Sequence, residues 1–200
     1  MKQQLILGVV MSAMTVSAHA YQNASAQNFS AEVLLGVANQ DTDFGGGDRA
    51  SGSSTSFGVR GAYTFNPNVA VELSYQYYGS YDDSWQDQFG WVDETFTSSA
   101  LMGGLKVSLP LSAGYSVVGR LGAAYWDFEL EETDAGFPDD VFVFDDSDLG
   151  VYYGIGLQLD ITQALFISVE YTGVPMTASL GGYTVKHRTD NLSASLGFRF

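Results

Sequence analysis

The sequence alternates apolar and polar residues with a period of two, and it does so in eight separate segments. The first segment places Phe29, Ala31, Val33, Leu35 and Val37 at alternate positions. The other seven lie within 56–65, 69–77, 97–109, 115–125, 151–160, 165–171 and 191–200. Because the side chains of a β-strand point alternately to opposite faces, this period predicts strands with one apolar and one polar face.

The connections between these segments alternate in length. Short connections lie at 66–68, 110–114 and 161–164, and long ones lie at 41–54, 79–94, 129–148 and 172–189. This alternation is typical of an eight-stranded antiparallel up-and-down transmembrane β-barrel, with short periplasmic turns and four long outer loops. Each segment can supply the roughly 10 residues that a tilted membrane strand needs. Both chain ends are then expected on the periplasmic side.

The apolar faces favour a lipid environment over the core of a soluble β-sandwich or a lipocalin, whose strands also alternate. Aromatic residues gather near strand ends, as in membrane girdles, at Tyr63, Phe65, Tyr75, Tyr77, Tyr115 and Tyr125. The polar faces carry too much glycine, serine and charge for a sandwich core. Phe198 and Phe200 end the chain on the apolar face and form the predicted signal for the barrel-assembly machinery.

The first 20 residues have the pattern of a secretory signal peptide. Lys2 gives a positive start, 5–16 is apolar, and Ala18-His19-Ala20 offers a small-x-small cleavage site. We predict a signal peptide at 1–20, a short lead-in at 21–27 and the barrel at 28–200, located in the cell outer membrane after export. The chain has no cysteine, so neither lipid attachment through cysteine nor disulfides are expected.

Several segments resemble the OmpA-type transmembrane domain and the wider family of small outer-membrane barrels. They are FGVRGAYTFNPNVAVELSYQYYG at 57–79, LPLSAGYSVVGRLGAAYWD at 109–127 and SLGFRF at 195–200. The resemblance implies an outer-membrane barrel over nearly the whole chain beyond residue 20. Many OmpA-type proteins continue into a domain that binds peptidoglycan, whereas this chain stops at its eighth segment, so direct anchoring to the cell wall is not expected.

The polar faces place charged side chains inside the predicted barrel. They are Glu32, Arg60, Glu72, Lys106, Arg120, Glu170 and Arg199, with Asp160 near the lower rim. An eight-stranded barrel is only wide enough inside for side chains, so these charges are expected to pair with one another. Counting from the short turns predicts two layers, with Arg60, Arg120 and Glu170 about two residues above the others. The network either plugs the lumen or forms a gate for small solutes.

Most other charges are acidic and lie in the long connections. The formal net charge is −15, and 18 of the 23 acidic residues fall in or beside the first three of them. This balance argues against a nucleic-acid partner. Two interpretations remain open for the carboxylates: a solvated, self-repelling surface, or a site for divalent cations such as calcium that bridge to lipopolysaccharide phosphates.

No pattern in the sequence points to catalysis or to a cofactor. The one histidine beyond the predicted signal peptide is His187, which we predict to lie at the surface. Lipid A deacylases of the small-barrel type use His-x-Ser, whereas this chain has His187-x-Thr189. Lys186 and Arg188 flank the histidine and suggest a basic patch for lipopolysaccharide phosphates. We therefore predict that the protein is not an enzyme and carries no resident metal.

The sequence favours a structural barrel that also makes surface contacts. Two alternatives remain: a narrow small-solute channel, and an adhesin that acts through acidic loops two and three. Those loops also contain apolar groups at Trp85, Phe89, Trp91 and 141–144. An exposed apolar patch can mark a partner site, but 141–144 fits an extension of the barrel wall as a hairpin better.

Overall fold

The computed structural model describes residues 28–200 apart from 46–47, 87–89, 113, 135–136 and 181–182. The predicted signal peptide at 1–20 and the lead-in at 21–27 lie outside the described residues. None of the described residues forms a helix that is long and apolar enough to cross a membrane.

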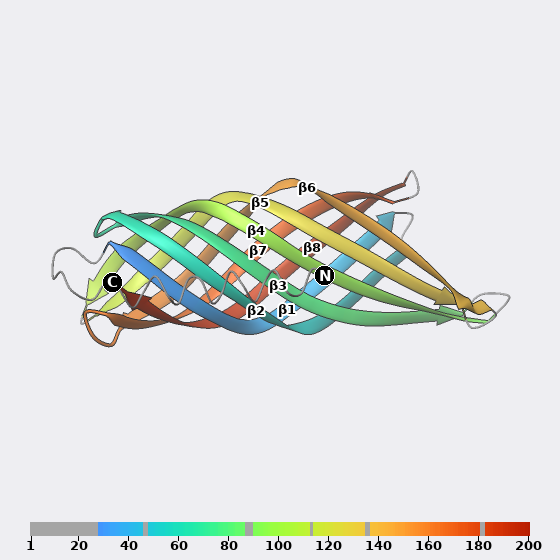
Figure 1. The fold of residues 1–200 in the computed structure, drawn as a ribbon, viewed down its shortest axis with the longest axis horizontal. Helices are drawn as coiled ribbons and strands as arrows, with labels where there is room; N and C mark the ends of the chain where they lie inside the picture. The colour runs from blue at the N-terminus through green and yellow to red at the C-terminus, as the bar shows by residue number, and fades with distance from the viewer. Residues whose placement is uncertain (1–27, 46–47, 87–89, 113, 135–136, 181–182) are drawn as a thin grey trace.

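The described chain forms one closed antiparallel barrel, as predicted. Its strands are β1 (Phe29–Gly45), β2 (Asp48–Asn66), β3 (Val69–Gln86), β4 (Trp91–Ser112), β5 (Tyr115–Asp134), β6 (Phe137–Asp160), β7 (Leu165–Leu180) and β8 (Tyr183–Arg199). Each strand pairs with the next along the chain, and β1 pairs with β8 to close the ring (Figure 1). Phe29 and Phe200 exchange two backbone hydrogen bonds where the ring closes.

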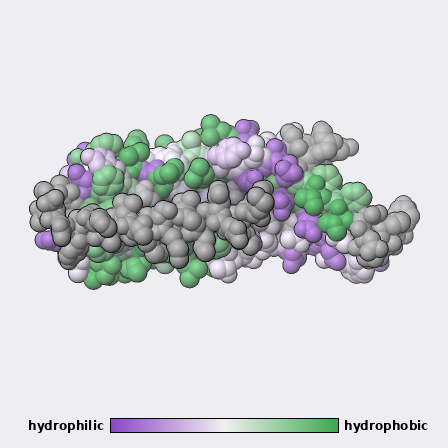
Figure 2. All heavy atoms as spheres, viewed as in Figure 1, coloured by the Kyte–Doolittle hydropathy of each residue, from purple (hydrophilic) through white to green (hydrophobic). Residues whose placement is uncertain are grey.

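The alternation of the sequence becomes an inner and an outer face of the barrel. On β1, Leu34 is buried while Val33 and Leu35 are exposed on the outside. Exposed apolar side chains occur on all eight strands and form a band around the half of the barrel that holds the C-terminus. Figure 2 shows part of this band on the side in view. In water this surface would be unstable, so the band marks the part that lies in lipid.

The three short turns lie together at the end of the barrel near the C-terminus (Figure 1). Asn66 begins the first turn and accepts a hydrogen bond from the Asn68 amide through its side chain, at 3.0 Å. Gly114 adopts φ of +87°, which favours glycine, and so allows the tight second turn. The hydroxyl of Thr162 accepts a hydrogen bond from the Leu165 amide in the third.

The four long connections differ from the predicted loops, because most of their residues continue the strands. Asp41 pairs with Ser51, Ser80 with Thr97, and Glu129 with Asp145. The hairpin predicted for 141–144 is confirmed, since these residues pair with β5. Continued pairing satisfies the backbone polar groups, and inward residues of these segments build a second core.

The wall of the barrel divides into two sheets beyond the apolar band. β2 pairs with β3 only as far as Phe57–Tyr77, and β6 pairs with β7 only as far as Tyr153–Gly173. Beyond these pairs, β3 to β6 form one sheet, here called the long outer sheet, and β7, β8, β1 and β2 form the short outer sheet. The long outer sheet extends farther, as Figure 1 shows.

Candidate functional site

The lumen within the apolar band contains five charged side chains that belong to one network. Glu32 comes from β1, Arg60 from β2, Glu72 from β3, Arg120 from β5 and Glu170 from β7. Each occupies an inward position of its strand, and each residue is only 1–4% exposed. We call these five residues the ion-pair layer.

Both arginines of the ion-pair layer reach all three carboxylates. Arg60 Nη1 lies 3.3 Å from Glu32 Oε2 and 3.0 Å from Glu170 Oε2. Arg60 Nε lies 3.8 Å from Glu72 Oε2. Arg120 lies 2.6 Å from Glu170, 3.2 Å from Glu72 and 3.9 Å from Glu32. Buried charges of this kind are stable only when they are paired, so the five side chains depend on one another.

Neutral hydroxyl groups also donate hydrogen bonds to two of the carboxylates. The Tyr152 hydroxyl donates to Glu72 Oε1 at 3.0 Å, and the Ser195 hydroxyl donates to Glu32 Oε2 at 2.9 Å. Hydrogen bonds to an ionised acceptor are shorter and stronger than neutral ones. The layer is therefore anchored to β6 and β8 as well as to the strands that carry its charges.

Two of the predicted network residues, Lys106 and Arg199, lie apart from this layer. Lys106 Nζ donates to Gln158 Oε1 at 2.8 Å, and Arg199 Nη2 pairs with Asp160 Oδ1 at 2.7 Å. The prediction of two layers was wrong for the five residues of the ion-pair layer, since Glu32 and Glu72 meet the arginines at one level. Strands in a closed barrel are tilted and staggered, so equal counts from the turns do not give equal heights.

An apolar core fills the lumen beyond the ion-pair layer, between the two outer sheets. It includes Tyr78, Phe96, Trp126, Phe128 and Met176, all buried. The rings of Tyr81 and Phe96 stack with centroids 4.7 Å apart, and Phe96 lies 6.3 Å from Phe128. Polar groups between the core and the layer bond to each other, as Ser56 does to Asn191 at 2.6 Å.

The sequence analysis did not predict this apolar core, although part of the alternating pattern that indicates it was present. Trp126, Phe128 and Leu130 continue the inward parity that Arg120 sets on β5. Tyr81 could not be found in this way, because a bulge between Tyr77 and Gly79 reverses the parity of β3. The bulge residue Gly79 has φ of +80°, a conformation that favours glycine.

His187 contradicts the prediction of a surface histidine. It lies on β8 beyond the apolar band, is only 1% exposed, and packs against Phe128 with ring centroids 4.6 Å apart. Its ring nitrogens lie within hydrogen-bond distance of Thr42 and Thr189. Burial lowers the pKa of His187 to about 4, so the ring is neutral at pH 7. His187 faces inward because it alternates in step with the other inward residues of β8. A catalytic triad would need a carboxylate beside the histidine, and none contacts it among the described residues.

The acidic residues of the outer region lie mostly on the long outer sheet. Glu94 pairs in register with Asp83 on one side and Glu132 on the other. Partial burial raises the pKa of Glu94, and these two neighbouring carboxylates raise it further. Within the described residues, no group of three or more acidic or histidine side chains is arranged to hold a metal ion. The calcium hypothesis therefore stays a prediction without structural support.

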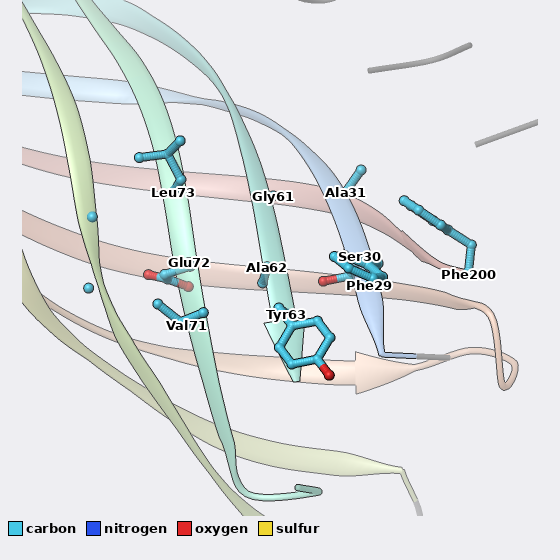
Figure 3. A pocket seen from close by; sticks show the side chains of 12 residues that line it. Phe29, Ser30, Ala31, Gly61, Ala62, Tyr63, Val71, Glu72, Leu73 and Phe200 are labelled. Carbon is cyan, nitrogen blue, oxygen red and sulfur yellow. The ribbon is translucent and has the colours of Figure 1, made fainter. Parts of the chain in front are cut away.

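Two of the hollows lined by described residues lie in the part of the barrel within the apolar band. The larger, about 890 Å³, lies on the outer wall, where Ala31, Gly61 and Leu73 sit side by side on neighbouring strands (Figure 3). Its walls are apolar and belong to the lipid-facing surface. The smaller, about 230 Å³, lies inside the barrel at the end with the short turns.

The residues predicted to direct assembly lie at the closing seam of the barrel. Phe198 points outward on β8, and the ring of Phe200 stacks on Phe29 with centroids 6.2 Å apart. Their recognition by the assembly machinery stays a prediction.

Comparison with known proteins places this architecture in a family. The family model of the outer membrane protein β-barrel domain matches residues 8–200. The chain belongs to this family. It is therefore an outer-membrane β-barrel of the Gram-negative type that sits in the lipid bilayer.

Solved structures show the same barrel fold. Ail, the attachment invasion locus protein of Yersinia pestis, is 20% identical with a TM-score of 0.52, over 86% of this chain and 99% of its own. Neisserial surface protein A is 14% identical with a TM-score of 0.55, over 85% and 97%. The outer membrane protease OmpT of Escherichia coli is 11% identical with a TM-score of 0.52, over 90% and 99%.

All three solved structures are distant in sequence from this barrel. At such identities the structures establish the fold alone. The family is mostly non-enzymatic, although OmpT is a protease. No curated protein matches the sequence.

The ion-pair layer predicts a strong dependence of stability on charge balance. Arg120→Met leaves three carboxylates facing one guanidinium and should lower the free energy of unfolding by about 3–5 kcal/mol. Adding Glu72→Gln restores the original balance and should recover a large part of the loss. Urea unfolding of the refolded protein, followed by tryptophan fluorescence, measures both effects.

Lys186→Met, which removes an exposed charge on β8, serves as the control and should change stability little. A double variant that loses the sum of its two single effects would show that Arg120 and Glu72 do not act as one network.

Proposed function

We propose that the protein is a structural barrel of the outer membrane whose lumen is closed to solutes. The observation that carries this proposal is the ion-pair layer, in which two arginines and three carboxylates meet across the lumen with at most 4% exposure. A passing solute would have to separate these charges in a low-dielectric interior, at a cost of several kcal/mol per ion. The apolar core beyond the layer, with Phe96, Trp126 and Phe128, is a second barrier.

Contacts with lipopolysaccharide fit the outer edge of the apolar band. Arg188 points outward there, and its guanidinium donates to the hydroxyls of Tyr153 and Tyr171 at 3.2 and 3.4 Å. Asp190 also pairs with it at 2.9 Å and holds the side chain in place. Exposed Lys186 lies two residues away on β8. Such cations, beside tyrosines at the head-group level, suit the phosphates of the outer leaflet.

Single-channel recording in planar bilayers tests the closed lumen. The refolded protein should be electrically silent, and Arg120→Ala should remain silent because the apolar core still blocks the path. Steady openings of the unchanged protein, with a conductance that changes in Arg120→Ala, would contradict the proposal and favour the narrow-channel alternative.

A second candidate function, binding of a partner at the cell surface, is favoured by the exposed edge of β6. Among the described residues, β6 has no partner strand on its β7 side from Phe137 to Tyr152. The backbone amides of Ser147 and Leu149 instead donate hydrogen bonds to the neighbouring side chains of Asp146 and Asp148. By the alternation of an antiparallel strand, Val141, Val143 and Asp145 present their backbone groups to the same open side.

The chemistry of this edge suits an extended, positively charged segment. The side chains of 141–144 are exposed and β-favouring, and Val143 is 54% exposed. Acidic residues surround them on the long outer sheet, including Glu129, Glu131 and Asp145. A partner strand could add to the open edge through backbone hydrogen bonds, with lysine or arginine side chains facing these carboxylates.

A short labelled peptide of alternating lysine and valine provides the test. Fluorescence anisotropy should detect its binding, whereas a matched glutamate–valine peptide should not bind. Val143→Pro removes an amide from the open edge and should weaken binding by at least about tenfold, the effect of roughly 1.4 kcal/mol. Equal binding of both peptides, or no effect of Val143→Pro, would remove this candidate.

A further inference from the structure

The lumen below the ion-pair layer opens toward the short turns as a polar cavity of about 230 Å³. We call it the periplasmic cup. Its lining includes Ser30, Lys106, Ser108, Ser116, Asp160 and Arg199. One water molecule takes about 30 Å³ of liquid volume, so the cup has space for several waters or for one small solute. Because it lies inside the wall, it is reached from the periplasmic side.

Lys106 is the unusual group in this cup. Its residue is only 8% exposed, yet among the described residues its ammonium forms no ion pair with a carboxylate. Its hydrogen bond goes to the neutral amide oxygen of Gln158, and Nζ lies 5.4 Å from the ring centroid of Phe166. The other lumen cations, Arg60, Arg120 and Arg199, each have a carboxylate partner.

Asp160, the carboxylate among the lining residues of the cup, forms no ion pair with Lys106 and is engaged elsewhere. Asp160 Oδ1 accepts from Arg199 at 2.7 Å and from the Gln158 amide nitrogen at 2.8 Å. The cup therefore has two cations against one anion. An ammonium has three N–H donors, and a buried one without a charged partner is costly unless an anion approaches it.

The ion-pair layer above contains three carboxylates and two guanidiniums, so Lys106 also offsets its surplus negative charge over a longer distance. Offsetting charge at a distance does not use the other two N–H donors of the Lys106 ammonium. Lys106 lines the cavity. Hydroxyl groups of Ser108 and Ser116 line the same cavity from β4 and β5. A cation with several hydroxyls around a small space is an arrangement suited to an oxyanion, which accepts hydrogen bonds in several directions.

We infer that the periplasmic cup binds a small oxyanion, such as inorganic phosphate, with Lys106 as the charged anchor and Ser108 and Ser116 as further donors. Arg199, which flanks the ring of Phe166 at 4.6 Å from its centroid, adds positive potential at the entrance. The site occupies only the periplasmic end of the lumen and goes beyond the proposed closed barrel. It would exist whether or not the layer above it opens.

Nuclear magnetic resonance of the lysine side chains tests this site directly. The full chain has three lysines, Lys2, Lys106 and Lys186. The protein is labelled with ¹³C at lysine Cε, refolded in micelles and titrated with inorganic phosphate at constant ionic strength. The Lys106 signal should shift and saturate, while the signal of exposed Lys186 should not saturate. Chloride in place of phosphate should leave Lys106 unchanged.

Two variants assign the signals and supply a second measurement. Phosphate should raise the urea midpoint of the unchanged protein and of Lys186→Met, but not that of Lys106→Met. If Lys106→Met does not fold, the titration of the unchanged protein and of Lys186→Met still decides. A Lys106 signal that does not move with phosphate, or that moves without saturation as Lys186 does, would overturn the inference.

Discussion

A strand that crosses a lipid bilayer has no water to satisfy its backbone polar groups, so each strand must pair on both sides. In this protein the pairing of β1 with β8 meets that requirement and closes the ring. Where lipid ends, the requirement ends as well. The wall then divides between β2 and β3 and between β6 and β7. The closed ring within the lipid creates the lumen that side chains fill. Outside the lipid the ring need not close, so β6 can have an open edge.

Closure with eight strands leaves a lumen that only side chains can fill. Below, the lumen holds a polar cup; in the middle it holds the ion-pair layer; beyond the apolar band it holds an apolar core. Charge inside the membrane part is balanced overall, since Glu32, Glu72, Glu170 and Asp160 oppose Arg60, Arg120, Lys106 and Arg199. Lys106 remains the member without a close carboxylate partner, which gives the cup its chemistry.

The period of two predicted much of this architecture, because an apolar side chain that faces lipid leaves a direct mark on the sequence. It predicted the eight strands, their order and the inward position of Glu32, Arg60 and Arg120. It did not predict which charges meet, because the stagger between strands depends on closure of the whole ring. It also failed for the outer hairpins, whose many aspartates and glycines resemble loops, and for His187, which the inward parity of β8 buries.

We propose that the ion-pair layer and the apolar core seal the lumen between them from both ends. The chain has no cysteine, so single cysteines can report access to a membrane-impermeant maleimide. Ser116→Cys in the cup and Ser51→Cys on the outer surface should react in the folded protein, whereas Ser56→Cys, fully buried between the two barriers, should react only after unfolding. Reaction of Ser56→Cys in the folded protein at the rate of Ser51→Cys would contradict the sealed lumen.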